Sequence, residues 1–172
     1  MPPTKSVVSA ILYKRVLGEL QFFTQIRWKP EVSPQYSGMI EIPAGIIDPY
    51  ENVYDALHRE IKEETNLDIV RIVDNYRGDT VYTRENDSAF VFKPFVCQQV
   101  LETNDGLPWI GFVFLCEVTG EVIIQESEAK DPKWLSFSEL EEMLERKETV
   151  FILQYPVLQH FVSEYKTGNI LL

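Results

Sequence analysis

The chain has 172 residues, a length that suits a single domain spanning residues 1–172. It carries 27 acidic side chains against 16 Lys and Arg, a formal charge of −11, which disfavours nucleic acid and anionic membranes as general partners. No apolar run reaches the roughly 20 residues that span a bilayer, and the first residues lack an apolar signal core. We therefore expect a cytoplasmic protein that binds neither nucleic acid nor membrane. Cys97 and Cys116 lie in apolar segments without metal-ligand spacing, which predicts two buried free thiols.

The first third of the chain has the pattern of β-structure. Residues 6–13 and 20–28 combine β-branched and aromatic residues at strand length, and Gly18-Glu19 between them predicts a hairpin turn. A short apolar run at residues 39–42 ends at Pro43-Ala44-Gly45, a sequence that does not easily continue a strand. We expect a loop to begin there.

A helix is predicted from Pro49 to about Thr65. Asp48 can accept a hydrogen bond at the N-cap, Pro49 suits the first helical position, and Glu51 stands at the third. Asn66 is the predicted helix end, because Asn is second only to Gly in tolerating the left-handed backbone needed there.

The rest of the chain predicts a mixed sheet and two more helices. Strand-like segments lie at 69–73, 80–83, 89–100 and 109–118, and helices are expected from Ser136 to about Arg146 and over 155–166. Together these elements predict an α/β (α+β) fold, an α/β/α sandwich with about three helices packed on one curved, mixed β-sheet.

The predicted helix over 49–65 carries a cluster of carboxylates. At about 100° per residue, Glu60, Glu63 and Glu64 fall within one arc of the helix. Clustered carboxylates without His or Cys favour a hard cation such as Mg²⁺ or Mn²⁺, and Mg²⁺ commonly also binds the phosphates of its substrate. The alternative is a solvated acidic face on which Arg59 and Lys62 serve as ion-pair partners.

The spacing of these residues distinguishes the two interpretations. The pattern G-x5-E-x7-R-E-U-x-E-E-x-G-U, with U a bulky aliphatic residue, is matched by Gly45, Glu51, Arg59, Glu60, Ile61, Glu63, Glu64 and Leu67. This segment, residues 45–67, resembles the Nudix box, and it departs from it only at Asn66, where the family has Gly. The residues Ile40 to Ala44 and Trp134-Leu135-Ser136 extend the resemblance more loosely.

The resemblance to Nudix hydrolases implies a metal-dependent enzyme that cleaves the diphosphate linkage of a nucleoside diphosphate joined to another moiety. The implied cofactor is Mg²⁺, with Mn²⁺ as an alternative. Glu60 and Glu64 would be the main metal ligands, Glu63 would bind directly or through water, and the backbone carbonyl of Ala44 would complete the site.

The resemblance also assigns supporting and catalytic roles. Arg59 would orient the carboxylates, Glu51 would pair with Arg59, and Gly45 would permit the turn that brings a carbonyl toward the metal. A general base is still needed, either a box Glu or an acid from a later loop. Glu128 is our candidate there, with Glu126 and Asp131 as neighbours, so that the implied catalytic set is Glu63, Glu64, Arg59 and Glu128.

The substrate is suggested by the residues before the box. Gln25-Ile26-Arg27, followed by a loop and Glu41 to Gly45, is similar to ADP-ribose and ADP-sugar pyrophosphatases, in which Arg27 would hold a phosphate. Arg27 and the adjacent Trp28 are the predicted substrate-binding residues. Tyr36, Tyr82 and Trp109 are further candidates to stack on a base, and the sequence does not rank them.

Several alternatives remain open at this stage. The proline that ADP-ribose pyrophosphatases often carry past the box is absent, so dinucleoside polyphosphates and nucleoside triphosphates are alternative substrates. A nucleotide-binding sensor without turnover is a second function class, and an interaction protein with a solvated acidic helix is a third. Many proteins of this resemblance are homodimers, although the sequence itself shows no interface.

Overall fold

The structure, a computed structural model, describes residues 4–84, 87–104, 106 and 108–172. The strands are β1 (Lys5–Val16), β2 (Glu19–Arg27), β3 (Ile40–Glu41), β4 (Ala44–Ile46), β5 (Asp68–Ile72), β6 (Tyr76–Arg77), β7 (Val81–Arg84), β8 (Asp87–Ala89), β9 (Phe92–Lys93), β10 (Val96–Val100), β11 (Trp109–Thr119) and β12 (Ala129–Leu135). The helices are α1 (Val53–Thr65), α2 (Phe137–Glu145) and α3 (Tyr155–Lys166), with a 3₁₀ turn, η1 (Lys147–Thr149), between the last two.

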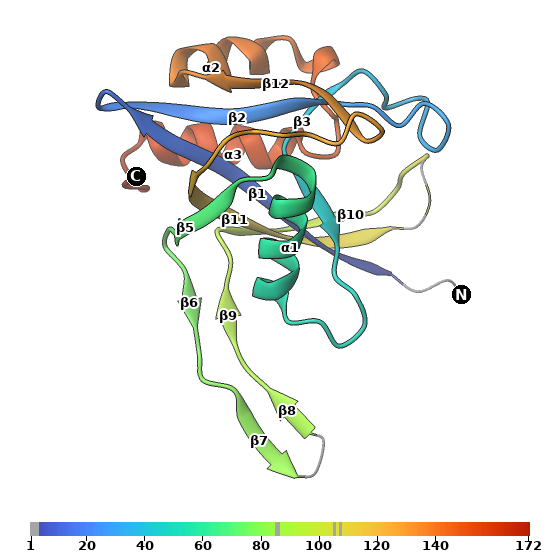
Figure 1. Cartoon of the computed structure of the whole chain (residues 1–172), viewed down its shortest axis with the longest axis vertical. Coiled ribbons are helices and arrows are strands. Elements are labelled where there is room, and N and C mark those ends of the chain that lie inside the picture. Colours follow the sequence, from blue (N-terminus) through green and yellow to red (C-terminus); the bar gives the residue numbers. More distant parts are fainter. Residues whose placement is uncertain (1–3, 85–86, 105, 107) are drawn as a thin grey trace.

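A mixed sheet of eight strands forms the centre of the molecule (Figure 1). Its main path runs β10-β11-β1-β2-β12, and β5, β4 and β3 pair with β11, β1 and β2 respectively. β1 is parallel to β11 and antiparallel to β2. The mixed sheet and the three α-helices in the described part of the chain confirm the predicted fold class.

Helices cover both faces of this sheet because its central strand is apolar on both sides. Ile11 and Tyr13 of β1 belong to the core shared with α2 and α3, whereas Ala10 and Leu12 belong to the core under α1. Since successive side chains in a strand point to opposite faces, β1 contributes to both cores. α1 on one face and α2 with α3 on the other complete the sandwich (Figure 1).

The start of α1 differs from the prediction. The helix begins at Val53, with Asn52 as its N-cap accepting a hydrogen bond from the Tyr54 amide, so the predicted start at residue 49 was wrong. Glu51 does accept a hydrogen bond from the Asp48 amide, at 2.9 Å, but this bond closes a turn before the helix. Tyr50 has a left-handed φ of 66°, which cannot belong to an α-helix.

The other helix limits agree closely with the sequence. Asn66 ends α1 with a left-handed φ of 62°, as predicted from the tolerance of Asn for this backbone conformation. Ser136 caps α2 through a full capping box with Glu139. α3 occupies the predicted residues, 155–166.

Three predictions about strands need correction. The loop expected to begin at Pro43-Ala44-Gly45 is instead strand β4 from Ala44 onward, because this segment pairs with β1. The expected strand over 89–100 is divided among β8, β9 and β10. Pro94, which cannot donate to a ladder, lies in the break between β9 and β10. β6–β9 and β7–β8 pair as two short ribbons that project from the body of the molecule (Figure 1). β12 was not predicted, since Asp131 and Pro132 within it are typical of loops; a register shift between Lys130 and Lys133 accommodates them.

The cysteines and the surface give two further results. Cys116 is buried as expected, but Cys97 is exposed, because it lies on β10 at an end of the sheet path. No helix in the described ranges is long and apolar enough to cross a membrane.

Candidate active site

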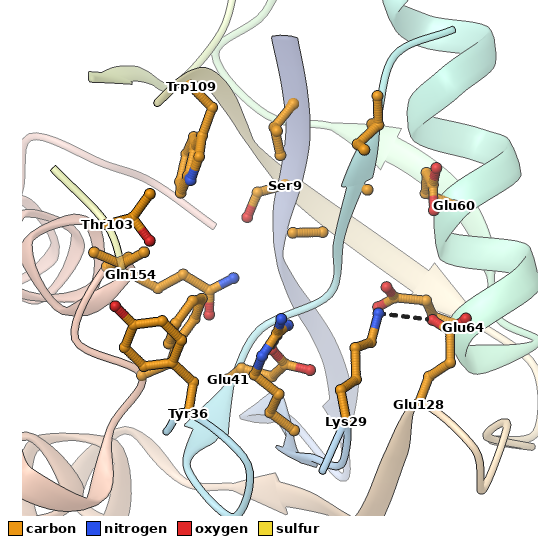
Figure 2. A pocket seen from close by; sticks show the side chains of 17 residues that line it. Ser9, Lys29, Tyr36, Glu41, Glu60, Glu64, Thr103, Trp109, Glu128 and Gln154 are labelled. Carbon is orange, nitrogen blue, oxygen red and sulfur yellow. Dashed lines mark hydrogen bonds and ion pairs between the residues drawn. The ribbon is translucent and has the colours of Figure 1, made fainter. Parts of the chain in front are cut away.

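A pocket of about 350 Å³ opens between β1, β4, α1 and the start of α3 (Figure 2). Carboxylates line one end of it, and we call this the carboxylate end: Glu60, Glu64 and Glu128, beside Ala44 and Gly45. The other end, which we call the aromatic end, is lined by Tyr36, Trp109 and Phe151 with Ser9 and Thr103. Arg27 and Lys29 also line the pocket. The volume and the mixture of charged and aromatic walls are typical of a small-molecule site.

The register of α1 decides which box carboxylates reach the pocket. Leu57 and Ile61 are buried against the sheet, which leaves Glu60 and Glu64, one turn apart, on the side facing the pocket. Glu63 does not line the pocket. Its side chain is 56% exposed and lies 3.4 Å from the Arg59 guanidinium.

Arg59 connects α1 to the segment before the helix and to β4. Its Nε and Nη2 atoms donate to the two carboxylate oxygens of Glu51, each at 2.8 Å, and Nη2 also donates to the Ile46 carbonyl. The same guanidinium donates through Nη1 to Glu60 Oε1 at 2.6 Å. Donation from Arg59, with a second hydrogen bond from the Asp48 amide, lowers the pKa of Glu51 to about 2. The bidentate pair thus positions one pocket carboxylate from outside the pocket.

Gly45 makes room for the Glu60 carboxylate. A Cβ at this position would stand 1.8 Å from Glu60 Cδ and about as close to both carboxylate oxygens. Its φ is not left-handed, and its backbone pairs with Val8 in an ordinary strand register. Glycine here leaves space for the observed position of the Glu60 carboxylate, and the backbone makes no turn that only glycine could adopt.

Glu64 is a strongly perturbed acid of the pocket. Burial, followed by the negative charge of Glu41, raises its pKa to about 8. The pKa of Glu60 is also raised, chiefly by burial and against the opposing effect of Arg59. The Gln25 amide lies between the carboxylates of Glu64 and Glu41. Its Nε2 donates to Glu64 Oε2 at 3.3 Å and to Glu41 Oε1 at 3.5 Å. Carboxyl groups are thus crowded in a partly dry site that disfavours their charged form, so a cation that stabilises the charged form would be strongly favoured.

Two basic side chains from the β2–β3 region reach the same pocket. Lys29 Nζ lies 3.1 Å from Glu128 Oε2, and Figure 2 shows this pair beside Glu64. Arg27 donates to the buried carboxylate of Glu41 at 3.2 Å and to the Ser33 hydroxyl. Positive groups therefore stand next to the carboxylates, an arrangement suited to an anionic substrate.

Comparison with known proteins decides the family. A model of the NUDIX domain matches residues 7–155, most of the chain. This chain belongs to the NUDIX family. The assignment confirms the prediction of a Nudix-type pyrophosphohydrolase, whose substrates are small nucleotide derivatives. No curated protein matches the chain significantly.

Solved structures share this Nudix fold at low identity. A MutT protein from Methanosarcina mazei Go1 is 22% identical with a TM-score of 0.64, covering 95% of this chain and 96% of that chain. The NUDIX domain of Shewanella oneidensis NrtR, in complex with ADP ribose, is 13% identical with a TM-score of 0.62, covering 98% and 90%. An Ap4A hydrolase from C. elegans is 17% identical with a TM-score of 0.51, covering 94% and 98%. At these identities the likeness concerns the fold alone.

The carboxylate end fits the divalent metal that Nudix enzymes generally use. Its donors are hard oxygens, and Gly45 leaves the space beside Glu60. Within the described ranges, no three His, Cys, Asp or Glu side chains converge as a ready ligand set. That arrangement still suits Mg²⁺, which typically takes one or two protein carboxylates and completes its shell with water and substrate phosphates.

Two predicted binding residues lie outside the lining of the pocket. Trp28 packs under Lys130, whose Nζ lies 3.4 Å from the ring centroid. Tyr82 is exposed on the projecting ribbon. His58 is exposed on α1 and does not line the pocket.

The sequence did not single out several residues that the structure brings to the site. Gln25 and Glu41 were named only as parts of a segment and given no role of their own, although polar residues within short β-segments could have drawn attention to them. Gln154 gave no signal, yet its amide accepts from the Ile42 N–H at 2.9 Å and donates to the Ile42 carbonyl at 2.8 Å. It thereby fixes the start of α3 against the segment that leads into Ala44.

Proposed function

We propose that this Nudix protein is a Mg²⁺-dependent hydrolase that cleaves the diphosphate linkage of a nucleoside diphosphate joined to another moiety, with ADP-ribose or an ADP-sugar favoured. The observation that carries the proposal is the single pocket in which carboxylates, two basic side chains and an aromatic wall occur together. A nucleotide presents the matching groups in one molecule: a base, a sugar and a diphosphate. The whole chain is proposed to act as one cytoplasmic domain without a nucleic-acid or membrane partner, and a homodimer is consistent with this function.

Glu60, Glu64 and the Ala44 carbonyl are the proposed metal ligands, with Glu63 contributing through water from its exposed position. When bound, the metal supplies charge neutralisation at the diphosphate and lowers the pKa of a water molecule. Arg59 keeps the Glu60 carboxylate in place through its hydrogen bond and is itself held by Glu51.

The remaining roles follow from the groups near the carboxylates. Glu128 is the proposed general base, since it lines the pocket from the loop before β12 and pairs with a lysine that a substrate phosphate can attract away. Arg27 is the proposed phosphate ligand from β2. Trp28, the other residue predicted from sequence, would act on the substrate only through its neighbours, because its ring lies under Lys130.

A hydrolysis screen tests the proposal. ADP-ribose, ADP-glucose, NADH, diadenosine polyphosphates, nucleoside triphosphates and coenzyme A are incubated with the protein and Mg²⁺ or Mn²⁺, and the products are separated by chromatography. We expect ADP-ribose or an ADP-sugar to be cleaved fastest, yielding AMP and a sugar phosphate. Faster cleavage of a dinucleoside polyphosphate or a triphosphate would mean that the proposed substrate class is wrong. The C. elegans Ap4A hydrolase, which shares the fold, is a reason to include these compounds.

A sensor without turnover predicts a different result. A nucleotide would raise the melting temperature, but no compound would be cleaved with either metal. The presence of both pocket carboxylates and of the Arg59 contact argues against this function, since binding alone does not require them.

A further inference from the structure

Three tryptophans are the strongest stacking groups of the chain, and their surroundings differ. Trp134 packs edge-on against Phe23 at a centroid distance of 5.3 Å and lies under Lys14, while Trp28 lies under Lys130. Trp109 lines the pocket and, within the described residues, has neither an aromatic nor a cationic partner. Of the three, Trp109 therefore offers a ring face to a ligand.

The position of the Trp109 ring depends on a glycine two residues further along β11. The Cζ3 and Cε3 atoms of Trp109 lie 2.7 and 3.4 Å from the place where a Cβ of Gly111 would stand. Because residues i and i+2 of a strand share a face, the missing side chain lets the indole lie down over Gly111. The indole ring is half-buried: it packs over the strand at Gly111 and also lines the pocket (Figure 2).

A second observation comes from Ser9 on β1. Ser9 is only 5% exposed and lines the pocket, and its Oγ has no hydrogen-bond partner among the described residues. Buried hydroxyl groups are normally paired, so an unpaired one in a pocket wall points to a ligand that supplies the partner. Figure 2 shows Ser9 between Trp109 and the carboxylates.

The strand register shows how far Trp109 and Ser9 lie from the proposed metal site. Trp109 pairs with Lys5 in the β1–β11 ladder, and Ser9 pairs with Ala44 in the β1–β4 ladder. Trp109 and Ala44 are therefore two strands and four residues of register apart, which corresponds to about 16 Å between their Cα atoms. A nucleoside diphosphate can span this interval with its base at one end and its phosphates at the other.

We infer that the aromatic end is the nucleoside subsite, in which the nucleobase stacks on Trp109 and the Ser9 hydroxyl hydrogen-bonds the nucleoside. The inference rests on the proposed function, because it assigns the two halves of the substrate within the same pocket. Stacking gives affinity with little choice among bases, since every base has a π-face. The group beyond the diphosphate then lies past the carboxylates, away from Trp109.

Binding of AMP in the absence of metal tests the subsite without relying on catalysis. AMP is titrated into the full chain, binding is followed by tryptophan fluorescence and by calorimetry, and ribose 5-phosphate serves as the ligand without a base. We expect AMP to quench the wild type and Trp134→Phe, whose tryptophan lies outside the pocket lining, and to quench Trp109→Phe far less. Trp109→Ala should weaken AMP binding about tenfold or more, with ribose 5-phosphate affected little.

Ser9→Ala separates ligand binding from folding. Removing a buried, unpaired hydroxyl should leave the melting temperature unchanged or raise it, while weakening AMP binding several-fold.

The inference is overturned if AMP binds Trp109→Ala and Ser9→Ala as it binds the wild type, or if the wild type shows no AMP binding at millimolar concentration. AMP binding that depends on Trp109, without any hydrolysis in the screen, would support the subsite and refute the proposed function. Hydrolysis of ADP-ribose with an unchanged KM in Trp109→Ala would support the proposed function and refute the subsite.

Discussion

The two ends of the pocket are built in different ways. The carboxylate end comes mainly from one continuous segment, from Ala44 to Glu64, whose internal spacing already brings its groups together. The aromatic end collects Tyr36, Trp109 and Phe151 from three distant parts of the chain. Chemistry carried by one helix and its loop is therefore readable as a motif, whereas a binding wall assembled across a sheet is not.

The largest expected effect is at the carboxylate end. Glu64→Gln removes a proposed ligand charge and should lower kcat by about 10²-fold or more under saturating Mg²⁺, with the fold retained. Glu126→Gln is the matched control, because Glu126 is an exposed acid in the loop before β12 and does not line the pocket. Near-normal turnover in Glu64→Gln would remove this residue from the catalytic set.

A smaller loss is expected when the same end is disturbed without changing any charge. Gly45→Ala places a methyl group where the Glu60 carboxylate now lies, so the carboxylate must leave its position beside Arg59. We expect kcat/KM to fall by about tenfold or more, with a rise in the Mg²⁺ concentration needed for half-maximal rate. Unchanged Mg²⁺ dependence would show that Glu60 does not need this position.

The contact that holds the start of α3 against the segment before Ala44 can be tested by measuring stability. Gln154→Ala leaves the Ile42 N–H and carbonyl without their side-chain partner, and we expect a loss of about 2 kcal/mol in the free energy of unfolding. Denaturant titration measures it. The control is Gln159→Ala on the same helix, because Gln159 is exposed and should cost little. A loss of the same size in both variants would contradict the specific role of Gln154.

The last predictions concern the pH dependence of stability, which has opposite signs for two acids of the box. The pKa of Glu64 is raised from 4.5 to about 8, so its contribution to metal-free stability is full below pH 4.5 and is lost as pH rises through about 8. The pKa of Glu51 is lowered to about 2, so its contribution is present above pH 4.5 and is lost as pH falls toward 2. Melting temperatures of Glu64→Gln and Glu51→Gln against the wild type should diverge in these two separate ranges. Parallel pH profiles would show that neither acid has the environment described here.

Much of the fold and of the carboxylate end followed from sequence, for identifiable reasons. The spacing from Gly45 to Leu67 predicted the loop–helix element, and Asn66 marked its end because few residues accept a left-handed backbone. The start of α1 was predicted wrongly, because Asp48 and Glu51 carry the local signal of a helix cap but form a turn instead. The side chain of Glu51 reaches across the turn to Arg59, a contact that the capping pattern does not encode.

The family motif, the near-continuous apolar run that makes β1 apolar on both faces, and the three helices can all be read from the sequence. These are local properties, set by residues close together in the chain. Only the tertiary structure decided that Glu63 faces solvent while Glu64 is buried near Glu41, and that Trp109 rather than Trp28 lines the pocket. Burial and electric field at a side chain depend on segments that pack against it from elsewhere in the fold, and for that reason they are not written in the local pattern.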